Sequence, residues 1–364
     1  MTLQRSQTLG LTLALLTSLT LSGGALATPI TWHVESAGEA QGVLPVKNGE
    51  DNVWVWESTI ETAIVAGLSE HWAVATEIIL EPVVDGDGTS FSQEGVYIGV
   101  LELTYSQANW TIAAGKIGPN FATAWDITPG IFGMELAEEY EVAEQIGVRT
   151  DVLLPSFEAQ PWDEVVVSGA LFMEDTTVLS RSILRDRGRV RENDGGPGNT
   201  GSLESYAFAL DMYDMLAEGI HFHVSHRRLA QAHDMAHPDD ATAAAINWHH
   251  EGEWAFTPSI NLEHIWYDNP QGAAGDGDST TMGVVVERGR WRAGAVYSRT
   301  AYRWHTHSDY QRLREIAVGY SLTPSLSVDL AYKQQANKGE DKQDFLGILI
   351  AADLVHIWRG GEGD

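Results

Sequence analysis

The sequence predicts an all-β fold, a closed antiparallel β-barrel of about 16 strands that spans a membrane. Three observations lead to this prediction. From Asp51 to Trp358, runs of roughly ten residues alternate apolar and polar side chains, the breaks between runs alternate between short and long, and the polar faces carry small or charged residues. A membrane barrel produces this double alternation because lipid-facing and lumen-facing residues alternate along each strand, and because turns and loops lie at opposite ends.

The segment from Glu57 to Ile64 illustrates the alternation within a strand. Every second residue from Glu57 is polar or small, and the residues between them include Ile60 and Ile64. The same pattern recurs at 206–212 and 326–333, as expected for strands whose successive side chains point to opposite sides. A soluble β-sandwich would need bulky apolar residues on its inner face. Here the inner faces are polar or small, which favours the membrane barrel.

The N-terminal segment 1–27 has the pattern of a cleaved secretory signal peptide. Arg5 precedes an apolar stretch from Leu9 to Leu21, and small residues follow at 25–27. The apolar stretch is shorter than the ~20 residues of a membrane anchor, and no later segment reaches ~18 uninterrupted apolar residues. We therefore expect one domain, the barrel, over residues 28–364.

Composition limits the partners of the chain. It contains no cysteine, so disulfides cannot stabilise it, and a closed sheet without exposed edges must do so. There are 51 acidic and 22 basic side chains, and the formal net charge is -29. A negative field of this size repels nucleic acid and attracts cations.

The breaks between strands sort into two alternating series. The short breaks are 67–70, 106–109, 155–163, 216–219, 250–253, 288–290 and 322–325, and the long ones are 36–52, 83–94, 118–144, 176–202, 231–240, 269–278, 303–310 and 335–342. Outer-membrane barrels have short periplasmic turns and long extracellular loops, so both termini are periplasmic only with an even strand count. This parity requires an additional first strand, which we place at Ile30–Glu35.

Aromatic residues follow several of the short breaks directly. Trp72, Trp110, Trp254 and Trp291 occupy such positions, and Phe222 lies in a similar place. Amphipathic rings favour the membrane interface, so we expect these residues to form the periplasmic aromatic girdle.

The long break 118–144 is the most distinctive segment. It follows Gly115-Lys116 and, if the first strand exists, strand five. Here the chain resembles the Gram-negative porins, 16-stranded diffusion channels whose third extracellular loop folds into the barrel. In that family the loop carries acidic groups that narrow the pore opposite a basic wall. The resemblance implies a homotrimer as well, although the residues themselves leave monomer and trimer open.

The resemblance also implies the pore-lining residues. The acidic constriction residues would be Asp126, Glu135, Glu138, Glu139, Glu141 and Glu144; Lys116 and Arg149 would lie on the flanking strands, with Arg149, Arg227, Arg292 and Lys333 as basic wall residues facing inward. Carboxylates opposite arginines would set up a transverse field that selects polar solutes. The alternative for each residue is a charge that is merely solvated in the lumen.

Two features depart from the family pattern. The last aromatic, Trp358, is followed by 359–364, whereas the family commonly ends on the aromatic, so the end of the last strand stays open. The loop 118–144 is also rich in Phe, Ile and Trp, which leaves the pore width open.

Two further clusters have competing interpretations. Arginines recur at 181, 185, 187, 189 and 191, where guanidinium groups could meet lipopolysaccharide phosphates, although a solvated loop is the favoured interpretation. His221 and His223 point the same way on one strand, but no carboxylate or cysteine stands at ligand spacing, so we expect no metal site. No G-x-S-x-G motif occurs, and nothing in the sequence places a serine beside a histidine and an orienting third group.

The sequence therefore predicts an outer-membrane channel without a cofactor or enzymatic activity, surrounded by lipid and lipopolysaccharide. It would pass small hydrophilic solutes and ions and prefer cations. The alternatives are a substrate-specific channel, and a plugged barrel that serves as a surface binding or structural protein.

Overall fold

A computed structural model describes residues 31–46, 54–84, 93–155, 164–250 and 254–359. The predicted signal peptide, 1–27, lies outside the described residues. The strands are β1 (Thr31–Pro45), β2 (Val55–Gly67), β3 (Trp72–Pro82), β4 (Glu94–Gln107), β5 (Trp110–Ile117), β6 (Gln145–Leu153), β7 (Glu164–Glu174), β8 (Ile183–Leu184), β9 (Ser205–Tyr213), β10 (Ile220–Leu229), β11 (Asp239–His249), β12 (Thr257–Asp268), β13 (Gly275–Arg288), β14 (Trp291–Trp304), β15 (Ser308–Thr323), β16 (Leu326–Asn337) and β17 (Gln343–Arg359).

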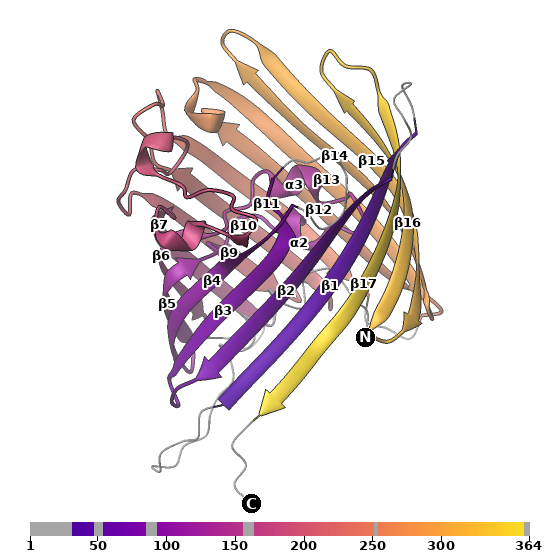
Figure 1. Cartoon of the computed structure of the whole chain (residues 1–364), viewed down its shortest axis with the longest axis horizontal. Helices are drawn as coiled ribbons and strands as arrows, with labels where there is room; N and C mark the ends of the chain where they lie inside the picture. The colour runs from indigo at the N-terminus through magenta and orange to yellow at the C-terminus, as the bar shows by residue number, and fades with distance from the viewer. Residues whose placement is uncertain (1–30, 47–53, 85–92, 156–163, 251–253, 360–364) are drawn as a thin grey trace, which may run out of the picture.

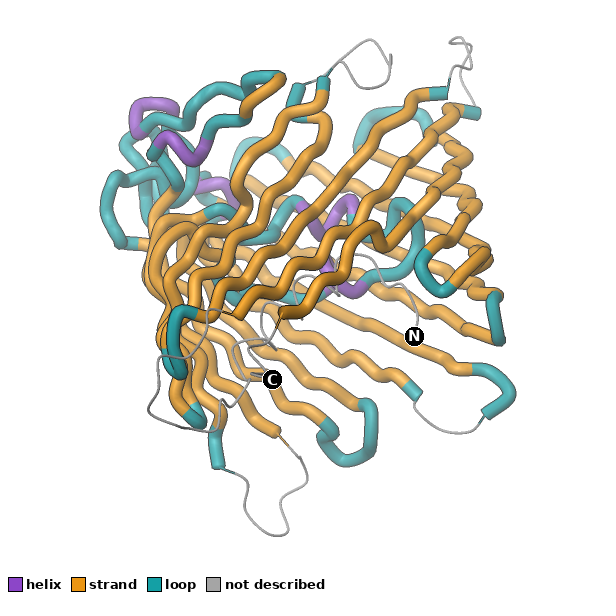
Figure 2. The backbone as a smooth tube through the Cα atoms, turned by 60° about the horizontal axis from the view of Figure 1, so that its bottom comes forward, coloured by secondary structure: helices purple, strands orange, loops and turns teal. Residues whose placement is uncertain are grey.

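These strands form one antiparallel sheet that closes on itself (Figures 1 and 2). The two-residue β8 belongs to a loop, and the other 16 strands form the barrel wall, as the sequence predicts. Short helices are present, α2 (Ala124–Ile127) and α3 (Glu135–Glu138), with one-turn helices at 178–180, 192–194 and 270–272. No helix among the described residues has the length and apolar character needed to cross a bilayer.

The predicted first strand closes the barrel. β1 pairs with β2 on one edge and with β17, the last strand, on the other. The strand is longer than predicted, because Ser36–Pro45 continues it and is not a loop. That part is rich in Gly, Ala and Glu, which have low strand propensity, but hydrogen bonding on both edges holds it in the sheet.

Three other predicted long breaks are shorter in the structure. Gly275–Asp278 pairs with β14 as the start of β13, which shortens that break to 269–274. The break predicted at 303–310 is reduced to 305–307, and the one at 335–342 is reduced to 338–342. The acidic and polar residues of these segments led to the wrong prediction, because backbone pairing with the neighbouring strands holds the segments in the sheet.

The two faces of the wall differ as predicted. Leu262, Met282 and Leu330 are among the exposed apolar side chains of the outer face, whereas neighbours such as Asn261 and Thr281 are buried inside. Trp72, Trp254 and Trp291 are exposed at the end with the short turns, where the aromatic girdle is expected. The outer surface is therefore suited to lipid and the inner surface to water.

Candidate functional site

The segment between β5 and β6, residues 118–144, is called loop L3 below. It is the third long connection of the barrel, as predicted, and carries α2 and α3 in the interior (Figure 1). The chain leaves the wall just after Gly115, whose φ is +142° and where a Cβ would collide with the Leu101 carbonyl oxygen. Only glycine fits this close approach of β5 to β4.

Glu263, on the inner face of β12, is the first attachment point of L3. Its Oε2 accepts hydrogen bonds from the backbone N–H of Thr123 at 2.6 Å, from that residue's hydroxyl at 3.1 Å and from the N–H of Ala124 at 3.2 Å. Its Oε1 accepts one from the Tyr140 hydroxyl at 2.6 Å. Glu263 is 1% exposed, so these bonds form away from bulk water. One buried carboxylate thus holds both ends of L3.

Glu315, on β15, attaches the middle of the loop. It accepts hydrogen bonds from the backbone N–H groups of Ile131 at 2.6 Å and Phe132 at 3.1 Å. The preceding Gly130 has φ +102°, and a side chain there would collide with this carboxylate. Two inward-facing glutamates, neither of which we predicted to be functional, therefore fix L3 against the β12–β15 side of the wall.

The aromatic and aliphatic residues of L3 reinforce this attachment. Phe121 and Tyr140 pack among small wall residues that include Ala207 and Ala243, and Phe132 packs near Leu313 and Leu349. The sequence alone did not show what the apolar residues of the loop do. In the structure they pack against the inner wall from β7 to β17.

Glu135, a predicted constriction residue, is held by Lys333 of β16. The Lys333 Nζ lies 2.8 Å from both carboxylate oxygens and 4.4 Å from the centre of the Phe132 ring. This ion pair lies on the side of L3 that is attached to the wall. The two opposite charges therefore help to hold the loop against β16.

Glu144 and Lys116, also predicted for the constriction, lie in a buried ion cluster in the barrel wall. Lys116 Nζ is 2.7 Å from Glu144 and 3.1 Å from Asp175, and its side chain is fully buried. Arg187 forms a further ion pair with Glu144 and stacks on Tyr97. No solute in the lumen reaches the Lys116 ammonium group.

This cluster seals a gap that L3 opens in the wall. β5 ends opposite Leu101, so the upper part of β4 lacks its β5 partner. The loop 175–204 fills the gap, because its β8 pairs with Gly95 and Val96 of β4. Arg187 of that loop thus has a sealing role that the sequence did not indicate, and lipopolysaccharide contact by its other arginines stays a prediction.

Replacing Lys116 with methionine should destabilise the barrel by about 3 kcal/mol, because it leaves the buried Asp175 carboxylate without its cation. The measurement is the temperature at which the folded, fast-migrating form is lost on SDS gels. The exposed Lys342→Met variant is the control and should match the wild type. Equal unfolding temperatures for all three proteins would contradict the sealing role.

Three of the arginines predicted to form a basic wall are ion-paired with carboxylates that also belong to the barrel wall. Arg149 lies 2.8 Å from Glu102, Arg227 lies 3.2 Å from Asp239, and the Arg292 Nε lies 2.7 Å from Asp329. Each partner is on a nearby strand. The transverse field between L3 carboxylates and these arginines, which the porin resemblance implied, therefore stays a prediction, and each of the three arginines also has a carboxylate partner on the wall.

The free side of L3 is acidic and faces an acidic wall. Burial raises the pKa of Glu141 to about 8, and repulsion from Glu138, Glu77, Asp126 and Glu144 adds to the shift. Each of these carboxylates is therefore near enough to repel the Glu141 carboxylate. Glu77 projects from β3, whereas the others belong to L3.

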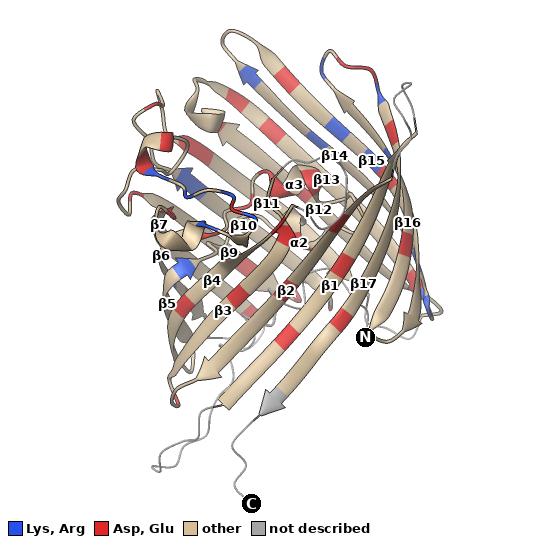
Figure 3. Ribbon diagram, viewed as in Figure 1, with Lys and Arg blue, Asp and Glu red and all other residues tan. Residues whose placement is uncertain are grey.

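Other acidic residues of β1 to β3 extend this arrangement, and the acidic positions on these strands are red in Figure 3. Glu61 of β2 experiences repulsion from Glu77, Glu39, Glu81 and Asp126, so its surroundings span β1, β3 and L3. We call this group the acidic passage: Glu39, Glu61, Glu77, Glu81, Asp126, Glu138 and Glu141. It brings together three of the predicted constriction residues and four wall residues that the prediction missed.

Glu139, the remaining predicted residue, lies toward β15. Burial raises its pKa, as do Asp309 and Glu135, while a hydrogen bond with Gln311 acts in the opposite direction. It therefore belongs to the side of L3 away from the acidic passage.

A hydrogen-bonded chain on β9 and β10 corrects one sequence expectation. Asp211 lies 2.7 Å from His223 Nδ1, and His223 Nε2 lies 2.8 Å from the Ser225 hydroxyl, the connectivity of a Ser-His-Asp triad. However, His223 is fully buried and Ser225 is 2% exposed. The Ser225 oxygen instead accepts the Ala122 N–H of L3 at 3.0 Å, so the chain acts here as a further attachment of the loop.

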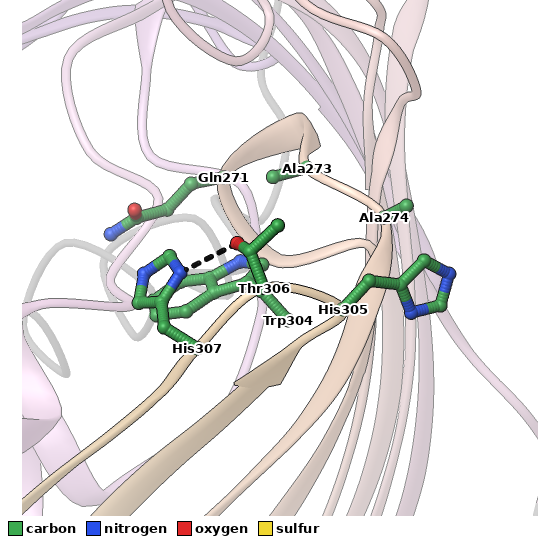
Figure 4. Close-up of a pocket in the computed structure, with 7 residues that line it drawn as sticks. All are labelled: Gln271, Ala273, Ala274, Trp304, His305, Thr306 and His307. Carbon is green, nitrogen blue, oxygen red and sulfur yellow. Dashed lines mark hydrogen bonds between the residues drawn. The ribbon is translucent and has the colours of Figure 1, made fainter.

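A separate cavity of about 390 Å³ lies at the end of the barrel that carries the long loops. It is lined by 271, 273–274 and 304–307 (Figure 4). The Trp304 and His307 rings stack at 4.5 Å, and His305 points away from them. The cavity lies outside L3 and the acidic passage.

No protein-family model and no curated protein matches the sequence. Solved structures do. The outer membrane channel DcaP of Acinetobacter baumannii aligns over 92% of this chain and 100% of its own, with TM-score 0.58 and 9% identity. The trimer form of OmpT from Vibrio cholerae covers 89% and 99%, with TM-score 0.53 and 10% identity, and Pseudomonas aeruginosa OpdK with vanillate covers 89% and 98%, with TM-score 0.52 and 8% identity. The shared feature is the fold, a closed antiparallel β-barrel.

Proposed function

We propose that this barrel is a porin-type channel that passes small hydrophilic solutes and ions and prefers cations. The acidic passage is the observation that carries the proposal. L3 is attached to the β12–β17 side, and its other side, with Asp126, Glu138 and Glu141, lies near carboxylates of β1 to β3. A water-filled passage with carboxylates on both sides attracts cations and repels anions.

Single-channel recording in planar bilayers tests the proposal. We expect steady conductance and, in a salt gradient, a reversal potential of the sign that cation preference gives. Folded protein that never conducts would contradict the channel, and anion preference would contradict the role of the acidic passage. We also propose that the protein is not an enzyme. A barrel that conducts has a function as a channel, whereas a barrel that stays closed would need another function.

A substrate-specific channel is the second candidate, because OpdK was solved with the organic anion vanillate. The arginines that could guide an anion in this chain, Arg149, Arg227 and Arg292, are each ion-paired with a wall carboxylate. Cationic solutes therefore fit this lumen better than anionic ones. Saturable block of conductance by one class of solute would support a specific channel.

We also propose a homotrimer, because OmpT was solved in a trimer form. Light scattering of the detergent-solubilised protein measures the mass directly. A single-barrel mass under conditions that preserve the fold would contradict this proposal.

Cation preference should increase as the pH rises from 6 to 9. Glu141, with a pKa of about 8, is mostly protonated at pH 6 and mostly ionised at pH 9, so the passage becomes more negative. The measurement is the reversal potential in a potassium chloride gradient at both values. Glu141→Gln, which cannot ionise, should show a smaller change, and a wild-type potential that does not vary would contradict the assignment.

A further inference from the structure

We propose that Asp211, His221 and His223 form a binding site for a divalent transition-metal cation, of the class of Zn²⁺, Cu²⁺ and Ni²⁺, on the inner wall of the barrel. Asp211 Oδ1 lies 2.9 Å from His221 Nε2 and 2.7 Å from His223 Nδ1. The three ligand atoms all lie within 4.8 Å of one another. Two imidazoles and one carboxylate are a donor set that suits these cations.

The register of two strands builds the site. Asp211 of β9 stands directly opposite His223 of β10, and His221 lies two residues before it on the same face. The sequence spacing places only the histidines together, whereas the carboxylate comes from the paired strand. This explains why the sequence did not predict a metal site.

The surrounding residues orient the ligands. Ser225 Oγ lies 2.8 Å from His223 Nε2, and the Asn247 amide lies 3.3 Å from His221 Nδ1. Asn120 of L3 donates a hydrogen bond to the second oxygen of Asp211 at 2.9 Å. Partners of this kind fix the ring orientation and the tautomer of metal-bound histidines.

The Asn247 side chain adds a specific observation. Its Oδ1 is buried and has no hydrogen-bond partner. With the amide turned over, this oxygen accepts a hydrogen bond from the Nδ1–H of His221, which leaves the lone pair of the neutral ring on Nε2, where a cation shared with Asp211 would be bound. Amide orientation is exchangeable in this way because oxygen and nitrogen occupy equivalent positions.

Burial indicates how a cation reaches the site. His223 is fully buried and Asp211 is 7% exposed, whereas His221 is 21% exposed. Entry is therefore from the lumen past His221. One carboxylate and two neutral imidazoles leave a positive charge on a bound divalent ion, and three protein ligands leave a coordination position for water. Through Asn120, the site is also linked to L3.

The experiment is equilibrium Zn²⁺ titration of the detergent-folded protein by calorimetry, with Co²⁺ absorption spectra to report on the ligands. Neither readout depends on conductance, so failure of this proposal and failure of the channel proposal are distinguishable. We expect saturable binding that weakens at least tenfold in His221→Gln, in His223→Gln and in Asp211→Asn, since even partners of metal ligands contribute about 10- to 100-fold.

Two controls make the test specific. His226→Gln replaces a histidine of the same strand that lies outside the site, and its affinity should equal that of the wild type. His356→Gln removes one imidazole from a second cluster of possible ligands, His33, Glu35 and His356, where β1 pairs with β17. This variant shows whether the second cluster binds the cation instead. If binding is lost only in His356→Gln, or if His221→Gln binds Zn²⁺ as the wild type does, the proposal is overturned. If His223→Gln does not fold, the Zn²⁺ affinity of His221→Gln decides the test, because His221 is partly exposed and its replacement disturbs the fold less.

Discussion

Replacing Glu263 with alanine will release L3 from the wall and increase the single-channel conductance. The substitution leaves the N–H groups of Thr123 and Ala124 and the Tyr140 hydroxyl without their acceptor. Hydrogen bonds to a charged group contribute about 1.5–3 kcal/mol each, so docking of the loop should weaken by at least about 3 kcal/mol. The remaining attachments, Glu315, the Glu135–Lys333 ion pair and Ser225, will hold L3 less firmly, so the loop should fluctuate more and the current should become larger and noisier.

Two variants calibrate this result. Tyr140→Phe removes one of the hydrogen bonds to Glu263 and should give an intermediate change. Glu164→Ala removes an exposed carboxylate at the start of β7 and should leave the conductance unchanged. Protease cleavage within L3 is the independent readout, and resistance of the Glu263→Ala loop equal to that of the wild type would show that this carboxylate does not hold it.

Neutralising the acidic passage will reduce the cation preference. The double variant Glu77→Gln and Glu141→Gln removes one carboxylate from the wall and one from L3, which repel each other across the passage. The interaction energy between a carboxylate and a cation 4 Å away is about 1 kcal/mol in water. Its loss corresponds to a decrease of about fivefold in the ratio of cation to anion permeability. The reversal potential at pH 9, where Glu141 is ionised in the wild type, measures the change.

The control variant also removes two negative charges, but at positions outside the acidic passage. Glu164→Gln combined with Glu340→Gln alters two exposed positions outside the passage and should keep the wild-type potential. If both double variants shift the potential equally, the overall charge of the protein sets the selectivity and the acidic passage does not.

The fold could be predicted because its signals are local. Alternation in β2 or β16, the short turns and the aromatic residues after them are each visible within a few residues. Strand parity then located β1, although its length was wrong because Gly and Ala in 36–45 are paired on both edges. Parity also identified L3 as the third loop.

The site could be predicted only in part, because it depends on which residues face one another across the lumen. The porin resemblance of the loop implied Asp126, Glu135, Glu138, Glu141 and Glu144 as one set. The structure separates Glu135 and Glu144 from the others by position, because they are ion-paired with Lys333 and Lys116. The partners that decide this difference lie on other elements, and no spacing in the sequence connects them.

The sequence by itself determined that the chain is a membrane barrel with an acidic third loop, since alternation and parity follow from the local geometry of strands. The tertiary structure decided which charged residues lie near one another. Glu263 and Glu315 hold the loop against one wall, the three wall arginines are paired with carboxylates of nearby strands, and the carboxylates of β1 to β3 lie near the acidic side of L3. Strand register and loop docking set those distances, and both arise from contacts between residues far apart in the chain.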